Sequence, residues 1–117
     1  MARLDRLLAN LGYGSRREVN ALVRAGGVVL DGVTLKYAGA KVPIVRELPA
    51  RMTISGVAVD PPAPLTLIMH KPLGVVCSHR EAGRSVYELL PTRWRARMPG
   101  LSTIGRLDKD TSGLLLI

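Results

Sequence analysis

The chain has 117 residues and a formal net charge of +8, with 17 lysines and arginines against 9 acidic residues. A chain of this length forms one compact domain or two very small ones, each with a limited core. The excess of positive charge favours a polyanion as partner, and arginine suits planar, bidentate contacts with phosphate. A basic balance also keeps a protein in solution, so the charge by itself leaves both explanations open.

The only cysteine, Cys77, excludes an internal disulfide and any zinc site built from several cysteines. It lies in the run GVVCS, where a buried strand thiol is the favoured interpretation, and His79 two residues on keeps thiol chemistry as the alternative. The start, MARLDRLL, lacks the apolar core of a signal peptide, and no run approaches membrane-spanning length. We therefore expect a soluble cytoplasmic protein with no membrane partner.

The first forty residues predict two short helices. Leucines at helical spacing predict a helix over residues 3–11 that ends at Gly12. A second helix is predicted to begin after Ser15, because Glu18 completes a capping box three residues later. The cations left for the polar side of the second helix are Arg16, Arg17 and Arg24.

Two β-hairpins are predicted to follow the helices. In VVLDGVTL, two β-prone runs flank Asp31-Gly32, and RMTISGVAVD repeats this pattern around Ser55-Gly56. The proline-rich segment DPPAP then interrupts regular structure. We therefore predict an α+β fold with a first domain over residues 1–60, a linker over residues 61–64 and a second domain over residues 65–117.

The second half predicts a strand, a short helix and two polar segments. The strand LTLIMHKP is ended by Pro72, with GVVCS as its expected neighbour. Ser85 and Glu88 offer a capping box for a helix through Leu90, and residues 79–84 are predicted to form a polar loop. The basic segment TRWRARM around Trp94 fits either an RNA-facing surface or a solvated loop.

The final stretch, GRLDKDTSGLLLI, carries a polar motif in front of an apolar run. Oxygen side chains at Asp108, Asp110 and Ser112 partly fit a calcium loop. The closing glutamate of such a loop falls beyond Ile117 and the flanking residues look like strands, so we expect no metal. A polar turn explains DKDTSG but not Arg106. A nearby arginine favours an ionised carboxylate, which leaves Asp108 available as a nucleophile or base.

Three blocks of the chain resemble one family. GRLDKDTSGLLL resembles the signature of bacterial pseudouridine synthases of the small-ribosomal-subunit group, and LIMHKPLGVVCS resembles the strand-and-turn motif that precedes it. The first half resembles the S4 RNA-binding domain that these enzymes carry at their N-terminus. The resemblance implies a small S4-type domain of two helices and a small sheet, followed by the N-terminal part of a mixed α/β catalytic domain.

The resemblance also implies a chemistry. An RNA uridine is cleaved at its glycosidic bond, rotated and rejoined through carbon, without a cofactor. Asp108 matches the catalytic aspartate, which attacks either the sugar or the base ring. Arg106 matches the arginine that enters the stack when the target base flips out. Lys71 and Pro72 are expected to line the cleft, with a solvated strand end as the alternative for Lys71, while residues 110–113 shape the loop.

The S4 resemblance assigns RNA contacts to the basic face of the helix pair. The candidates are Arg3, Arg6, Ser15, Arg16, Arg17 and Arg24. Contacts of this kind position RNA without reading its sequence, and for Ser15 capping alone is a sufficient explanation. The implied partner is ribosomal RNA or the assembling small ribosomal subunit. The alternative function is a stand-alone S4-type RNA-binding module without catalysis.

The apolar end of the chain predicts a strand buried on both faces. Catalytic domains of the family continue for about a hundred residues past the aspartate motif. Their later tyrosine and their later basic residue match no position in this chain. We therefore interpret the chain as the N-terminal part of a synthase that binds RNA and turns over slowly or not at all by itself.

Overall fold

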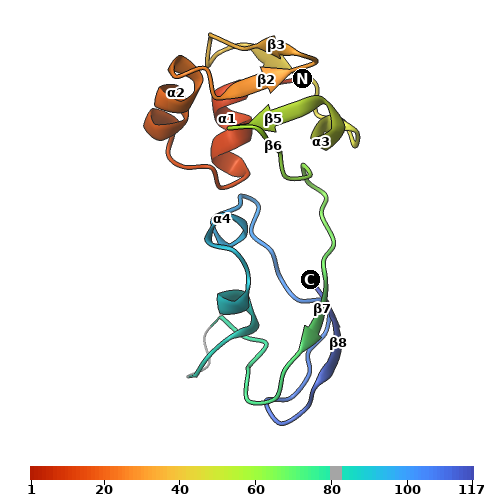
Figure 1. Cartoon of the computed structure of the whole chain (residues 1–117). Helices are drawn as coiled ribbons and strands as arrows, with labels where there is room; N and C mark the ends of the chain where they lie inside the picture. The colour runs from red at the N-terminus through yellow and green to blue at the C-terminus, as the bar shows by residue number, and fades with distance from the viewer. Residues whose placement is uncertain (80–82) are drawn as a thin grey trace. The chain divides into compact units, whose positions relative to one another are not determined.

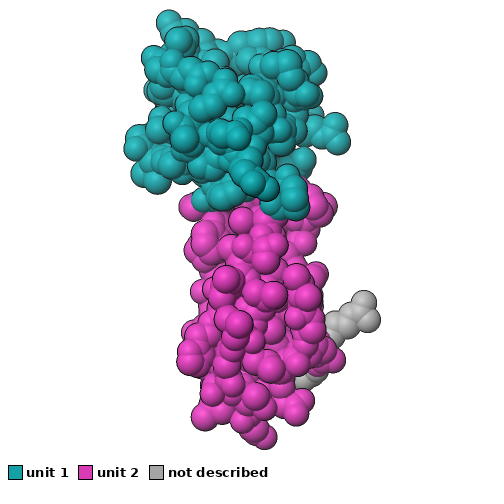
Figure 2. All heavy atoms as spheres, turned by 90° about the vertical axis from the view of Figure 1, so that its right-hand side faces the viewer, with its two compact units in different colours: residues 1–64 teal, residues 65–117 magenta. Residues whose placement is uncertain are grey.

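The computed structural model describes residues 1–79 and 83–117. The chain forms two compact units, Met1–Pro64 and Leu65–Ile117, which Figure 2 shows in different colours. The four residues expected to form a linker therefore fall at the end of the first unit. The polar loop expected over residues 79–84 lies partly outside the described residues.

Two short helices, α1 (Leu4–Asn10) and α2 (Arg16–Arg24), pack together in the first unit (Figure 1). The predicted capping box of α2 is confirmed, because the Ser15 hydroxyl accepts a hydrogen bond from the Glu18 N–H at 3.2 Å. In return, the Glu18 carboxylate accepts from the Ser15 N–H at 3.0 Å. The hydrogen bond to the Ser15 backbone lowers the pKa of the Glu18 carboxyl, and the interaction with the Ser15 side chain lowers it further.

A four-stranded antiparallel sheet follows the helices in the order β3-β2-β5-β6. Its strands are β2 (Val28–Leu30), β3 (Val33–Thr34), β5 (Met52–Ile54) and β6 (Val57–Ala58). Both predicted hairpins are confirmed. The turn Asp31-Gly32 has φ angles of 50° and 80°, and Ser55-Gly56 has 51° and 83°. Paired left-handed residues give the two-residue loop the twist of its flanking strands.

Three elements of the first unit have no counterpart among the predicted elements. β1 (Ala2–Arg3) pairs with β4 (Lys41–Val42), and the single turn α3 (Leu48–Arg51) leads into β5. Elements of two to four residues are too short to show a hydrophobic period, so sequence patterns do not reveal them.

One apolar cluster joins the helices to the sheet. Its buried members are Leu4, Leu7, Leu8, Leu11, Val19, Val23, Val28, Val42, Leu48, Met52, Ile54 and Val59. The three helices and the strands β2, β4 and β5 all contribute to this cluster, so the unit has a core of its own.

The second unit is organised around an antiparallel strand pair. β7 (Ile68–Lys71) pairs with β8 (Gly113–Leu116), with Ile68 opposite Leu116 and Lys71 opposite Gly113. The prediction that GVVCS neighbours the first strand is wrong. Pro72 has no N–H for a ladder and Gly74 has a φ of 82°, so the chain turns away from the sheet. Val76 instead forms an isolated bridge with Ser85.

Two short helical turns connect these strands. The 3₁₀ turn η1 (Val86–Leu89) lies where a helix through Leu90 was predicted. The helix α4 (Thr92–Arg95) lies within the basic segment around Trp94. The predicted capping box is wrong, because the Ser85 hydroxyl accepts from the Tyr87 N–H at 3.2 Å and not from the Glu88 N–H. The tighter 3₁₀ turn brings Tyr87, one residue earlier than Glu88, within reach of the cap.

The last strand is buried on one face only among the described residues. Leu115 and Ile117 are 3% exposed, whereas Leu114 is 71% and Leu116 is 37% exposed. β8 pairs along its length with β7, and Leu116 forms one further bridge with Ile104. Among the described residues, the face with Leu115 is packed and the face with Leu114 and Leu116 is open.

The buried face of β8 belongs to a second core. The buried members of this cluster are Val75, Cys77, Val86, Tyr87, Leu90, Leu115 and Ile117.

In the part of the chain that the structure describes, no helix has the length and hydropathy that a membrane span requires.

Asp5 is a buried carboxylate at the start of α1, with 4% of the residue exposed. Arg3 donates two hydrogen bonds of 3.2 Å to it, from Nε and Nη2, and the Arg6 N–H donates a third at 2.7 Å. The hydrogen bonds from Arg3 lower the pKa of Asp5 below its usual value despite its burial.

We expect Asp5→Asn to weaken the dependence of stability on acid pH. Because the pKa in the folded protein lies below that of the unfolded chain, the carboxylate stabilises the fold above about pH 4 and loses this effect as the pH falls further. Thermal unfolding followed by circular dichroism at neutral and acid pH measures the difference. If the melting temperature falls equally in the wild type and in Asp5→Asn between neutral and acid pH, the role of Asp5 is contradicted.

Candidate active site

A cavity of about 290 Å³ in the second unit contains the two central residues of the predicted site. Its walls come from two segments, Val76 with Cys77 and residues 106–109. Arg106 and Asp108 both line it. The cavity is also lined by Val76, Cys77 and Lys109, and the spacing of the motif did not predict that these residues lie there.

Asp108 lies on a loop that is fixed through its backbone. The Asp108 carbonyl accepts a hydrogen bond from the Thr111 N–H at 2.9 Å, which closes a turn. The next carbonyl, of Lys109, accepts from the Gly74 N–H at 2.8 Å and ties the loop to the turn after β7. The Asp108 side chain remains exposed. The backbone of the loop is therefore held while its carboxylate faces solvent.

Lys71, at the end of β7, holds the same loop from inside the unit. The residue is 0% exposed, and its Nζ donates to the Thr111 carbonyl at 2.7 Å and the Pro72 carbonyl at 3.0 Å. A longer contact of 3.4 Å reaches the Lys109 carbonyl. A buried ammonium group is tolerated only when such acceptors replace its water. We call this arrangement the Lys71 clamp.

The two expectations for Lys71 are therefore corrected. The side chain does not line the cavity and is not a solvated strand end, because it points into the unit and binds backbone oxygens. Pro72 is exposed but lies outside the cavity lining. Hydrophobic patterning cannot foresee this burial, since a lysine at a strand end normally extends into water.

Cys77 is buried, as expected, although it lies outside any strand. Its Sγ accepts a hydrogen bond from the Leu107 N–H at 3.5 Å, so it supports the backbone beside Asp108. The ring of His79 stacks on Tyr87 instead, with centroids 3.7 Å apart and planes 10° from parallel. The thiol thus acts as packing and as a weak acceptor, and the geometry does not support a thiol–imidazole pair.

The charges around the cavity suit an anionic ligand. Arg106 and Lys109 are exposed cations that line it beside the Asp108 carboxylate. In residues 1–79 and 83–117, Asp108 forms no ion pair, so its carboxylate is not occupied by Arg106. Nor does any group of three His, Cys, Asp or Glu in that part of the chain come close enough to hold a metal ion. The site offers one accessible carboxylate next to positive charge.

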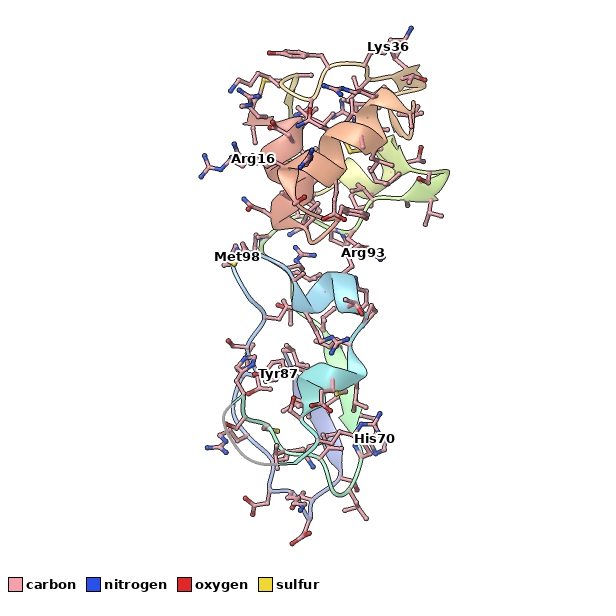
Figure 3. The ribbon with its side chains drawn as sticks, turned by 90° about the vertical axis from the view of Figure 1, so that its left-hand side faces the viewer. Arg16, Lys36, His70, Tyr87, Arg93 and Met98 are labelled. Atoms are coloured by element: carbon pink, nitrogen blue, oxygen red, sulfur yellow. The ribbon has the colours of Figure 1, made fainter. Side chains whose placement is uncertain are left out.

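The predicted RNA-binding residues divide into two groups in the first unit. Arg6, Arg16, Arg17 and Arg24 have exposed side chains, and Figure 3 shows Arg16 extending away from α2. Arg3 is tied to Asp5 and Ser15 is occupied by the capping box. The four exposed arginines are therefore the better candidates for phosphate contacts.

Lys71→Met should lower the free energy of unfolding by about 2–4 kcal/mol, because it leaves buried carbonyls without a charged donor. The amides of Gly74 and Thr111, which bond to the clamped loop, should exchange with solvent faster. Lys109→Met is the matched control, since that exposed side chain takes no part in the clamp. Equal amide exchange in the two variants would show that the loop does not depend on Lys71.

Two family models match the chain. Residues 2–44 match the S4 domain, and residues 65–117 match the RNA pseudouridylate synthase family. The first match falls within Met1–Pro64 and the second coincides with Leu65–Ile117.

Named relatives align with nearly the whole chain. The protein called uncharacterized RNA pseudouridine synthase YtzG, of Bacillus subtilis (strain 168), is 41% identical over 98% of this chain and 46% of its own length. Ribosomal large subunit pseudouridine synthase B of the same organism is 32% identical over 100% of this chain and 46% of its length. A solved structure titled crystal structure of pseudouridylate synthase has 22% identity and a TM-score of 0.42 over 99% of this chain and 47% of that one.

The chain thus spans about half the length of the relatives it matches. By these matches, residues 2–44 of the first unit are similar to the S4 domain, and the second unit is similar to part of an RNA pseudouridylate synthase.

Proposed function

We propose that this chain is part of a pseudouridine synthase that converts uridine to pseudouridine in ribosomal RNA, in the cytoplasm. The observation that carries the proposal is the position of Asp108: an exposed carboxylate beside two cations, on a loop that the Lys71 clamp and the Gly74 amide hold in place. By the motif resemblance it corresponds to the family's aspartate, and it lies within residues 65–117, which match the RNA pseudouridylate synthase family.

The reaction needs a carboxylate that can reach the target nucleotide. The uridine leaves the helical stack, at a cost of a few kcal/mol, and enters the cavity beside Asp108. The carboxylate forms a covalent bond either with the sugar or with the base ring, and the glycosidic N–C bond breaks. The base then rejoins the sugar through a ring carbon, the bond to Asp108 breaks, that carbon loses its proton, and the freed ring nitrogen takes one up. Arg106 fills the gap that the flipped base leaves. Its place in the same cavity wall supports this role.

The first unit holds the RNA in this proposal. Arg6, Arg16, Arg17 and Arg24 are exposed, and such side chains bind phosphate without reading sequence. The match of residues 2–44 to the S4 domain supports the assignment. Ser15 supports the start of α2 through its cap and leaves phosphate contacts to the arginines.

The choice of RNA within this proposal rests on motif resemblance. The signature around Asp108 resembles that of the small-ribosomal-subunit group, so we propose small-subunit RNA, free or in an assembling particle, as the substrate. Because a relative is named for the large subunit, large-subunit RNA is the competing substrate that a test has to include.

We also propose that the 117-residue polypeptide by itself binds RNA but turns over slowly or not at all. Asp108 has no basic side chain paired with it among the described residues, and the outer face of β8 is uncovered there. A site this open leaves the target base with few contacts and leaves water in place, which weakens electrostatic catalysis.

The test is a pseudouridine assay on both ribosomal RNAs with the 117-residue chain and with a protein extended to the length of its relatives. We expect activity in the extended protein on small-subunit RNA, and a loss of about ten-thousandfold or more in Asp108→Asn. Asp110→Asn is the matched control, because Asp110 is an exposed carboxylate on the same loop that does not line the cavity.

Three outcomes would count against parts of the proposal. Turnover by the 117-residue chain would refute its inactivity, and modification of large-subunit RNA alone would refute the choice of substrate. RNA binding without activity in any version would favour the stand-alone S4-type module.

A further inference from the structure

A cavity of about 240 Å³ lies within the first unit. It is lined by Arg3 and Asp5, by Asn20 and Arg24 of α2, and by the loop 36–39. The family motifs assign no role to this loop, and the conversion of uridine does not use it.

The loop presents an aromatic ring to solvent. Tyr37 is 69% exposed, in a chain with only three tyrosines, one tryptophan and no phenylalanine. The ring lies against Gly39, where an added Cβ would come within 2.6 Å of the Tyr37 Cζ and Oη. The ring therefore keeps this position because residue 39 has no side chain.

The backbone beneath the ring is anchored at both ends of the turn. The Ala40 N–H donates to the Tyr37 carbonyl at 3.1 Å, and the Asp5 N–H donates to the Ala38 carbonyl at 2.9 Å. The second bond ties the loop to the first residues of α1. Tyr37 is thus an exposed aromatic ring on a fixed backbone, which lowers the entropy cost of stacking a ligand on it.

The charges of the cavity favour phosphate over other ligands. Arg24 and Lys36 form no side-chain hydrogen bond or ion pair within residues 1–79 and 83–117, and Figure 3 shows Lys36 extending away from the ribbon. The carboxylate of Asp5 is already compensated by Arg3. Two uncompensated cations therefore flank an exposed aromatic ring.

We propose that this cavity binds one unpaired nucleotide of the RNA, with its base stacked on Tyr37 and its phosphate bound by Arg24 and Lys36. Aromatic rings beside basic side chains bind single-stranded nucleic acid in this way, and stacking tolerates any base because every base has a π face. A base inside a duplex is already stacked, so the cavity selects RNA with an unpaired nucleotide next to a helix. The proposal rests on the RNA-binding role proposed for the first unit.

The test compares two RNA probes with the full 117-residue chain. One is a blunt hairpin, and the other is the same hairpin with a single-stranded tail of about four nucleotides. We expect the wild-type chain to prefer the tailed hairpin about tenfold, the lower part of the range for stacking one base on an aromatic side chain. Tyr37→Phe should keep this preference because the ring remains.

Two variants should abolish the preference by different means. Tyr37→Ala removes the ring, and Gly39→Ala displaces it through the short approach of the new Cβ. Val57→Ala is the matched control, since Val57 is also 69% exposed and lies on β6. Lys36→Gln should weaken binding of the tailed hairpin and reduce the slope of log K against log salt by about one. Circular dichroism checks that each variant is folded.

The outcomes separate this proposal from the proposed function. If wild type binds both hairpins equally, or Tyr37→Ala keeps the preference for the tail, the nucleotide site is refuted while RNA binding by the first unit stands. If wild type binds neither hairpin, both proposals are refuted.

Discussion

The second unit depends on one buried cation at the end of a strand. An ammonium group without water costs several kcal/mol unless acceptors surround it. Lys71 meets this requirement with the carbonyls of Pro72 and Thr111, and its longer contact reaches Lys109. Because two of these oxygens belong to the loop that follows Asp108, satisfying the lysine also fixes the loop. The pairing of β7 with β8 brings the two segments together, with Lys71 opposite Gly113.

This arrangement separates support from chemistry. Lys71 and Cys77 are buried and act on backbone atoms, while the carboxylate of Asp108 is exposed beside Arg106 and Lys109. The first unit shows a similar division. The capping box and the Arg3–Asp5 pair stabilise the helices, and the remaining arginines of α2 are exposed for a polyanion. In both units, buried or paired side chains stabilise the backbone that carries the exposed charged side chains.

Local signals predicted much of the first unit. The capping box at Ser15 and the turns at Asp31-Gly32 and Ser55-Gly56 depend on neighbouring residues, and the structure confirms all three. Contacts between distant residues were missed. Nothing near Lys71 in the sequence reveals that a carbonyl forty residues later accepts a hydrogen bond from its ammonium group, or that β7 pairs with β8 and not with residues 74–78. The motif identified Asp108 and Arg106 as candidates. The cavity around them could not be predicted, because Val76 and Cys77, which also line it, come from a distant segment of the chain.

NMR of the lysine side-chain nitrogens tests directly whether a buried lysine holds the loop that follows Asp108. The chain has four lysines, and only Lys71 is 0% exposed and bonded to the Thr111 carbonyl. We expect one ammonium signal that exchanges slowly with water and shows a coupling through the hydrogen bond to the Thr111 carbonyl carbon. Four ammonium groups that all exchange rapidly, with no such coupling, would contradict it.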